Sequence, residues 1–221
     1  MSSSLDVFTW IKSRDTARTL ALLAEHPGAA FERDGGGVSA LMWSLYVGLP
    51  EVSEAIRAAL PGIDVFEAAS MGDRERVAQL LEAMPELVHA RSGDGFTALH
   101  FAAFFSRPEA AALLIAAGAD PAAVSDNPMA VQPLHSAAAA RSVETCRVLL
   151  EGGAPPDAPQ HQGWTALMSA AKHGFEPLVD LLLAHGARPD VRADDGRTAA
   201  DLAAEAGHHA LAARLTPPSA S

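Results

Sequence analysis

The sequence has one cysteine, Cys146, and only two lysines, Lys12 and Lys172, among its 221 residues. A single cysteine forms no internal disulfide, so a reducing compartment such as the cytoplasm is expected. No run approaches the ~18 to 20 apolar residues of a membrane span, and the chain starts with polar residues where a signal peptide is apolar. We therefore predict a soluble cytoplasmic protein with no membrane partner. Scarce lysine beside abundant alanine and arginine is typical of a GC-rich bacterial genome.

Positive charge is also scarce, because 27 acidic residues outnumber 16 basic ones and give a formal net charge of −11. This balance repels phosphate groups and disfavours nucleic acid as a partner. Since 49% of the residues are hydrophobic and 19% are charged, the composition excludes a disordered chain and supports a continuous core.

Motifs of the common catalytic and metal-binding classes are missing. The sequence contains no nucleophile elbow, phosphate loop, Cys-x-x-Cys pair or His-Glu-x-x-His helix. His208 and His209 are adjacent, so on a helix they diverge by ~100° and do not readily share a metal. Cys146 lies beside Val148, where a small buried side chain is expected instead of a nucleophile. We predict no catalytic residue, no metal site and no cofactor.

An internal repeat, by contrast, is plain in the sequence. Segments similar to the one that begins Thr97-Ala-Leu-His start at Gln132, Thr165 and Thr198. Their spacings are 35, 33 and 33 residues (132 − 97, 165 − 132 and 198 − 165). A leucine pair and then Gly-Ala follow each of the first three copies. A fixed period of this length is typical of stacked repeat units.

Each unit predicts a pair of helices. Thr97 suits a helix start, because its hydroxyl accepts from an unpaired backbone N–H. Leu149, on the second helix of its unit, is expected to be buried between units, and Gly153 stands where a left-handed helix cap is needed. His100 and His135 occupy one repeat position, where we expect them to hold the turn by hydrogen bonds.

The N-terminal part of the chain matches the next part at an offset of 58 residues. Asp6-Val-Phe matches Asp64-Val-Phe, and Gly37-Val-Ser-Ala-Leu matches Gly95-Phe-Thr-Ala-Leu (64 − 6 and 95 − 37). About seven helix pairs result, and Asp64 with Glu67 is expected to cap one first helix.

Two blocks are therefore predicted: residues 1–63 as degenerate units and residues 64–221 as a regular block with a polar C-terminal cap. Residues 60–64 are too few for a hairpin, so we expect a bend or altered stacking near residue 62. The tail 216–221 is expected to be frayed.

The pattern Gly-x-Thr-Ala-Leu-His-x-Ala-Ala from Gly95, followed by Leu113-Leu114 and by Gly118-Ala-Asp, resembles the ankyrin repeat. The resemblance implies an all-α solenoid of about seven helix-turn-helix units with projecting hairpin loops. It also implies a protein that binds other proteins and is not an enzyme. The sequence departs from the pattern where Met42 and Met168 replace the histidine, Gln132 the threonine and Ala130 the glycine.

Binding residues are expected where stacking makes no demand: at the ends of the first helices and in the hairpins. In the middle units these positions are apolar or aromatic, and a contiguous exposed apolar surface marks a binding site. Phe105 is expected near its centre. The predicted partner-binding residues are Tyr46, Val47, Met71, Phe96, Phe104, Phe105, Trp164, Lys172, His173 and Arg197.

The leading hypothesis is a non-catalytic interaction module, expected to be a monomer in preference to an oligomer, whose concave and partly aromatic groove holds a segment of another protein. One alternative is an acidic inhibitor or regulator that masks a basic site on one enzyme. Another is a structural homo-oligomer. The aromatic rings of the predicted binding surface have three possible roles: they bind a partner, pack inward over neighbouring hairpins or pack across a homodimer.

Overall fold

The computed structural model describes residues 6–216, in which the regular secondary structure consists of fourteen α-helices and three short 3-10 helices. The expectations for the polar start of the chain and for the tail concern mainly residues 1–5 and 217–221, which lie outside the described residues. The helices are α1 Val7–Lys12, α2 Thr16–Glu25, η1 Pro27–Phe31, α3 Ala40–Tyr46, α4 Pro50–Ala59, α5 Val65–Met71, α6 Arg74–Ala83, η2 Pro85–His89, α7 Ala98–Phe104, α8 Pro108–Ala116, α9 Pro133–Ala139, α10 Val143–Glu151, η3 His161–Gly163, α11 Ala166–Lys172, α12 Glu176–Ala184, α13 Ala199–Glu205 and α14 His209–Leu215.

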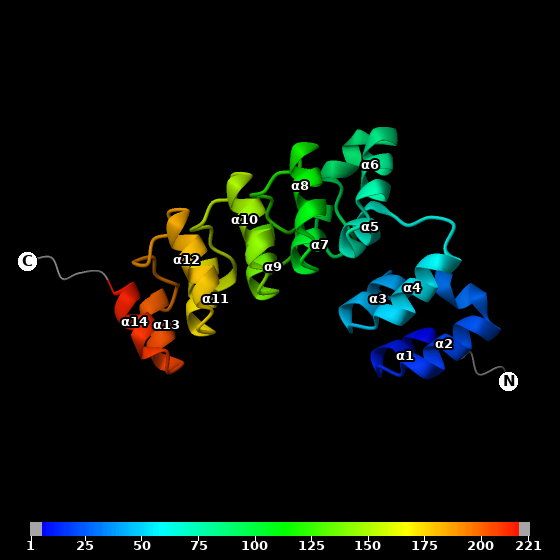
Figure 1. Cartoon of the computed structure of the whole chain (residues 1–221), viewed down its shortest axis with the longest axis horizontal. Coiled ribbons are helices and arrows are strands. Elements are labelled where there is room, and N and C mark those ends of the chain that lie inside the picture. Colours follow the sequence, from blue (N-terminus) through cyan, green and yellow to red (C-terminus); the bar gives the residue numbers. More distant parts are fainter. Residues whose placement is uncertain (1–5, 217–221) are drawn as a thin grey trace, which may run out of the picture.

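Consecutive helices form seven pairs that stack side by side in one row (Figure 1). The row is arched, and in its middle part the first helix of each pair (α5, α7, α9 and α11) lies on the inner side of the arch (Figure 1). The predicted all-α solenoid of about seven helix pairs is therefore confirmed.

Short-range hydrogen bonds explain where the first helices begin and how the second helices end. The Asp64 carboxylate accepts from the Glu67 N–H at 2.8 Å while the Glu67 carboxylate accepts from the Asp64 N–H at 3.0 Å, which is the predicted capping pair. Thr97 stands directly before α7 as predicted. Gly153 follows α10 with φ of 98°, a left-handed conformation that favours glycine.

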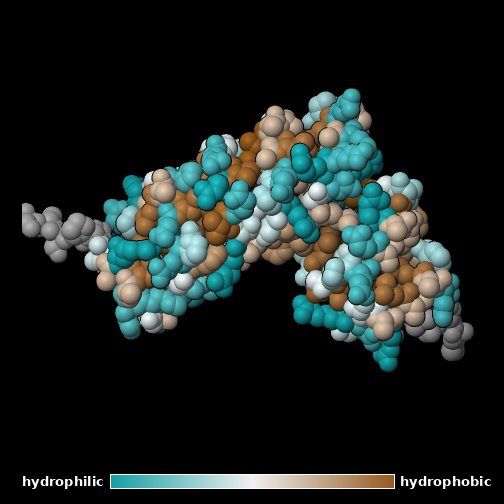
Figure 2. Space-filling model, viewed as in Figure 1, coloured by the Kyte–Doolittle hydropathy of each residue, from teal (hydrophilic) through white to brown (hydrophobic). Residues whose placement is uncertain are grey.

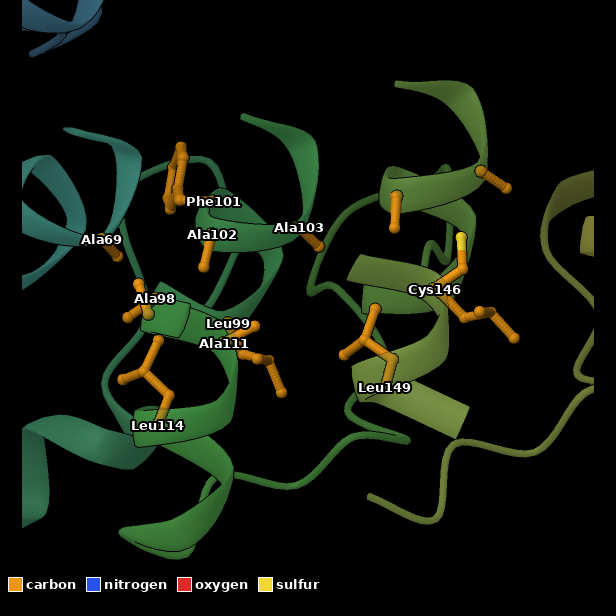
Figure 3. Close-up of a cluster of buried hydrophobic side chains, with 14 of the residues drawn as sticks. Ala69, Ala98, Leu99, Phe101, Ala102, Ala103, Ala111, Leu114, Cys146 and Leu149 are labelled. Atoms are coloured by element: carbon orange, nitrogen blue, oxygen red, sulfur yellow. The ribbon is translucent and has the colours of Figure 1, made fainter. Parts of the chain in front are cut away.

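Leucine and alanine side chains form the core between the units. Leu99 of α7, Leu114 of α8 and Leu149 of α10 lie in one buried layer, with small alanines where the helices approach closely (Figure 3). Leu182 of α12 continues this layer and is also fully buried. Cys146 is buried in the same core, and burial raises the pKa of its thiol to about 12, which keeps it protonated and unreactive.

The hairpins of the regular block are connected by backbone hydrogen bonds. The Asp126 N–H donates to the Gly95 carbonyl at 2.9 Å, and the His161 N–H donates to the Met129 carbonyl at 3.1 Å. The Asp194 N–H donates to the Gln162 carbonyl at 3.0 Å. Each hairpin thus fixes the position of the next one, from residue 90 to residue 197.

The row changes direction between α4 and α5, where residues 60–64 connect the pairs without a hairpin (Figure 1). Side chains replace the missing backbone bonds. The Ser39 hydroxyl donates to the buried Glu67 carboxylate at 2.6 Å, and Arg33 lies 3.5 Å from Asp64. Side-chain hydrogen bonds and ion pairs therefore connect the units across this junction.

Candidate functional site

An apolar groove lies where the first helices meet the hairpins in the middle of the row. Its volume is about 190 Å³, and its apolar and aromatic lining comes from two hairpins and from the helices α3, α7 and α9. These lining residues are Tyr46, Phe96, Phe101, Phe104, Met129, Val131 and Ala139. We call this cavity the central groove.

Three large side chains of the central groove are exposed to solvent. Phe104 is 47% exposed, Met129 58% and Tyr46 37%, whereas Phe101 and Val131 are buried beneath them. Exposed apolar side chains that gather in one contiguous patch mark interaction sites. The groove therefore offers apolar area that the fold itself does not use.

Aromatic contacts across the bend build one wall of the groove. Tyr46, at the end of α3, meets Phe104 edge-on with ring centroids 6.1 Å apart, and it meets Phe105 at 5.5 Å. Phe104 and Phe105 are themselves in edge-to-face contact at 5.1 Å. Since α3 and α7 belong to units separated by the α5–α6 pair, only the change of direction at residues 60–64 brings these rings together.

The long loop 124–131 supplies the opposite wall. The backbone of Ala130, which replaces the turn glycine, has φ of 49°, and the preceding Met129 lies over the groove. The Asn127 side chain donates to the Asp94 carbonyl at 2.9 Å and ties this loop to the previous hairpin. Met129 was not among the predicted site residues. The signal that could have revealed it is the length of its loop, because the repeat that contains it is 35 residues long and the next two are 33.

The histidines next to the groove are structural, as predicted. His100 Nδ1 accepts from the Thr97 N–H at 3.2 Å, so its Nε2 donates to the Val131 carbonyl at 2.9 Å. His135 repeats the arrangement, with Nε2 2.8 Å from the Ala158 carbonyl. Burial lowers the pKa of His100 to about 4 and also lowers the pKa of His135, so both rings stay neutral and hold the hairpins.

The predicted site residues fall into three groups. Tyr46, Phe96 and Phe104 line the central groove, whereas Trp164 and His173 line two other cavities that adjoin it. Half-buried side chains that pack against the core form the second group: Val47, Met71 and Phe105. The third group consists of Lys172 and Arg197, whose charges lie 5.1 and 6.0 Å from the centre of the Trp164 ring.

The exposed hydrophobic residues are not spread evenly over the molecule. On the face shown in Figure 2, hydrophobic patches lie over α8–α12 and over the N-terminal helices, with hydrophilic residues over α5 and α6 between them.

Residues 6–216 contain no cluster of three or more His, Cys, Asp or Glu side chains that could hold a metal ion. In the same range no helix has the length and apolar character of a membrane span.

Stacked helix pairs joined by projecting hairpins define a solenoid repeat protein whose exposed groove is apolar. The particular repeat is given by a family model described as ankyrin repeats (3 copies), which matches residues 65–160 and 134–220. These matches cover more than half of the chain, so the chain belongs to the ankyrin-repeat family. Proteins built from these repeats generally bind other proteins.

Several known proteins contain similar segments. The chain is 42% identical to Neurogenic locus notch homolog protein 4 of Homo sapiens over 122 residues, 54% of this chain and 6% of the human protein. It is 38% identical to Neurogenic locus Notch protein of Drosophila melanogaster over 108 residues, 48% of this chain and 4% of the fly protein. It is 37% identical to Glycerophosphocholine phosphodiesterase gde1 of Schizosaccharomyces pombe over 86 residues, 39% of this chain and 8% of the yeast protein. The chain thus spans less than a tenth of each relative.

Proposed function

We propose that this chain is a non-catalytic protein-binding module and that its central groove holds a segment of a partner protein. The observation that carries the proposal is the groove itself, an apolar cavity with Phe104 and Met129 exposed at its edge. Burying these side chains against a partner would remove apolar area from water, which is the main favourable term in most associations. Buried aromatic anchors dominate the binding energy of typical interfaces.

Further observations favour binding over chemistry. The imidazole rings that line the groove, those of His100 and His135, are neutral and already hydrogen-bonded to backbone carbonyls, so they offer no general base. Cys146 is fully buried and therefore unavailable as a nucleophile. The lone reduced cysteine agrees with the cytoplasmic location that we expect from the sequence.

A photo-crosslinking residue in place of Met129 tests the groove directly. In a lysate of the source cells, we expect it to crosslink one partner protein, identified by mass spectrometry. The matched control carries the same residue in place of Phe31, which is 55% exposed and lies outside the cavities described here. Equal crosslinking from both positions, or crosslinking only from Phe31, would contradict the proposal.

Substituting the exposed phenylalanine then measures its contribution. Phe104→Gln removes an apolar anchor without a change of charge, so affinity for the crosslinked partner should fall by ~2 kcal/mol or more. Phe31→Gln should leave affinity unchanged, and both variants should melt near the wild-type temperature. Unfolding of Phe104→Gln would instead assign the ring to the core.

Self-association is a separate outcome. Light scattering after size-exclusion chromatography should give the mass of one chain at working concentrations. If the chain instead forms a stable dimer and Phe104→Gln dissociates it, the groove is the contact surface for a second copy of the chain. Steep salt dependence without any effect of Phe104→Gln would favour the acidic inhibitor.

A further inference from the structure

Two further cavities extend the central groove toward the C-terminal units. The first, with a volume of about 240 Å³, contains Trp164 and shares Met129, Val131 and Gln160 with the groove. The second, of about 110 Å³, contains Phe175 and shares Ala139 with the groove. The three cavities therefore form one continuous surface.

This surface has no acidic lining residue within the described chain, although the sequence carries 27 acidic residues against 16 basic ones. The lack of acidic lining residues does not extend to the neighbouring cavity on the N-terminal side. The cavity on the other side of Tyr46 contains residues of both signs, Arg33 and Arg91 with Asp64 and Asp94. The lining of the groove and of its C-terminal extension thus lacks acidic residues, unlike the lining on the N-terminal side.

Two cations stand at that side without a counter-charge. The Arg141 guanidinium lies 4.6 Å from the centre of the Phe175 ring, and the Lys172 ammonium lies 5.1 Å from the centre of the Trp164 ring. Within residues 6–216 neither forms an ion pair, and both side chains are exposed. Arg197, near the same ring, differs because it pairs with Asp195 at 2.7 Å and with Glu205 at 2.8 Å.

Stacking on an aromatic ring keeps each cation in place without neutralising it. Arg141 lies two residues after the end of α9, and Lys172 is the last residue of α11, so in adjacent units both lie where the first helix turns into the second. An apolar groove continued by two uncompensated cations is complementary to a segment that has apolar and acidic residues in sequence.

We propose that the partner segment is an acidic–apolar peptide, with a bulky apolar side chain in the central groove and carboxylates against Arg141 and Lys172. This inference rests on the proposed function and specifies the chemistry of its partner. It runs against the net charge of the chain, from which a basic partner would be expected.

Selection from a library tests this proposal without a known partner. Random displayed dodecapeptides are selected for binding to the full chain, and the enriched sequences should combine a large apolar residue with Asp or Glu on one side. Fluorescence anisotropy then gives the Kd of the best peptide and of its analogue with Asn and Gln in place of the acids. The acidic peptide should bind about fivefold to tenfold more tightly, and less so as salt is added.

A charge-reversal pair assigns the effect to the two cations. The double variant Arg141→Glu, Lys172→Glu should lose the preference for the acidic peptide while still binding the neutral analogue. The control Arg74→Glu, Arg147→Glu makes the same change in net charge on second helices and should keep the wild-type preference. Enriched peptides with basic or uncharged flanks, or an unchanged preference in the first variant, would overturn the proposal.

Phe104→Gln separates this inference from the function on which it rests. If that variant loses all peptides but the wild type shows no preference for acids, the groove binds segments and only the acidic–apolar chemistry is wrong. If Phe104→Gln binds as the wild type does, or if the library yields no binder, both proposals fail. Displacement of the peptide by single-stranded oligothymidylate would assign the cations to phosphate and also overturn the inference.

Discussion

The two parts of the chain on either side of residues 60–64 are held together differently. From residue 90 onward, each hairpin after the first donates a backbone hydrogen bond to the preceding hairpin, and leucines fill the space between units. At the junction, the hydroxyl–carboxylate bond of Ser39 and Glu67 and the ion pair of Arg57 and Asp73 at 3.6 Å take over. In an array whose units contact only their neighbours, such a difference makes cooperativity depend on one interface.

Breaking the regular block should have the largest effect. Leu149→Ala and Leu182→Ala each remove a fully buried side chain and should lower the free energy of unfolding by ~2 to 5 kcal/mol, measured by urea denaturation. Leu183→Ala, at a half-buried position, should cost less. A loss below about 0.5 kcal/mol at either buried leucine would mean that the helix register is wrong.

Breaking the junction should destabilise one part of the chain. Glu67→Ala leaves the buried Ser39 hydroxyl and the Asp64 N–H without their acceptor, at a cost of ~1 to 3 kcal/mol. Native-state hydrogen exchange should show this loss in residues 6–60 and around α5. Asp201→Ala, which removes the equivalent carboxylate acceptor from the first turn of α13, should affect only the C-terminal unit.

The division of the chain at residue 64 remains a prediction that the same experiment sharpens. In the wild-type protein, residues 6–60 should open at lower free energy than residues 64–216. A fragment of residues 64–221 should fold alone with a cooperative thermal transition. Uniform protection across residues 60–64 would contradict the two-block division.

Lowering the pH should destabilise the regular block through His100. Because burial lowers the pKa of His100 from 6.5 to about 4, the unfolded state binds more protons between these values, and stability falls as pH falls through that window. Between pH 7 and pH 5 the loss from His100 should be about 2 kcal/mol. Methionine already occupies the equivalent position 42, so His100→Met should reduce the pH dependence, as followed by urea denaturation at both pH values. An unchanged pH dependence would show that His100 titrates normally.

A matched pair of glycines gives the smallest effect. Gly37 and Gly95 occupy equivalent turns with φ of 81° and 84°. A Cβ at Gly95 would overlap the Asp126 carbonyl of the next hairpin, whereas a Cβ at Gly37 would meet nothing within 4 Å. Both alanine variants incur ~1 kcal/mol for the left-handed backbone, and Gly95→Ala should cost about 1 kcal/mol more by thermal unfolding. Equal losses would mean that the hairpin contact adds nothing.

The repeat period, the capping residues and the buried leucines could be predicted from the sequence because each depends on local chemistry. The choice between Phe104 and Phe105 could not, since successive residues on a helix point ~100° apart and only the neighbouring units decide which ring lines the groove. Phe104 lines it, whereas Phe105 packs against the core. The contact of Tyr46 with α7 was also beyond the sequence, because the angle of the bend determines it.

Under the proposed function, the Tyr46 wall would make the N-terminal units part of the binding equilibrium. A ligand that contacts Tyr46 and Phe104 together binds only molecules in which these two rings are in contact across the junction. We call this state the closed junction. The apparent dissociation constant of the ligand is then the intrinsic constant divided by the closed fraction. Any modification or partner that loosens the Ser39–Glu67 bond would therefore weaken binding without touching the groove, and the bound segment would in turn hold the two parts of the chain together.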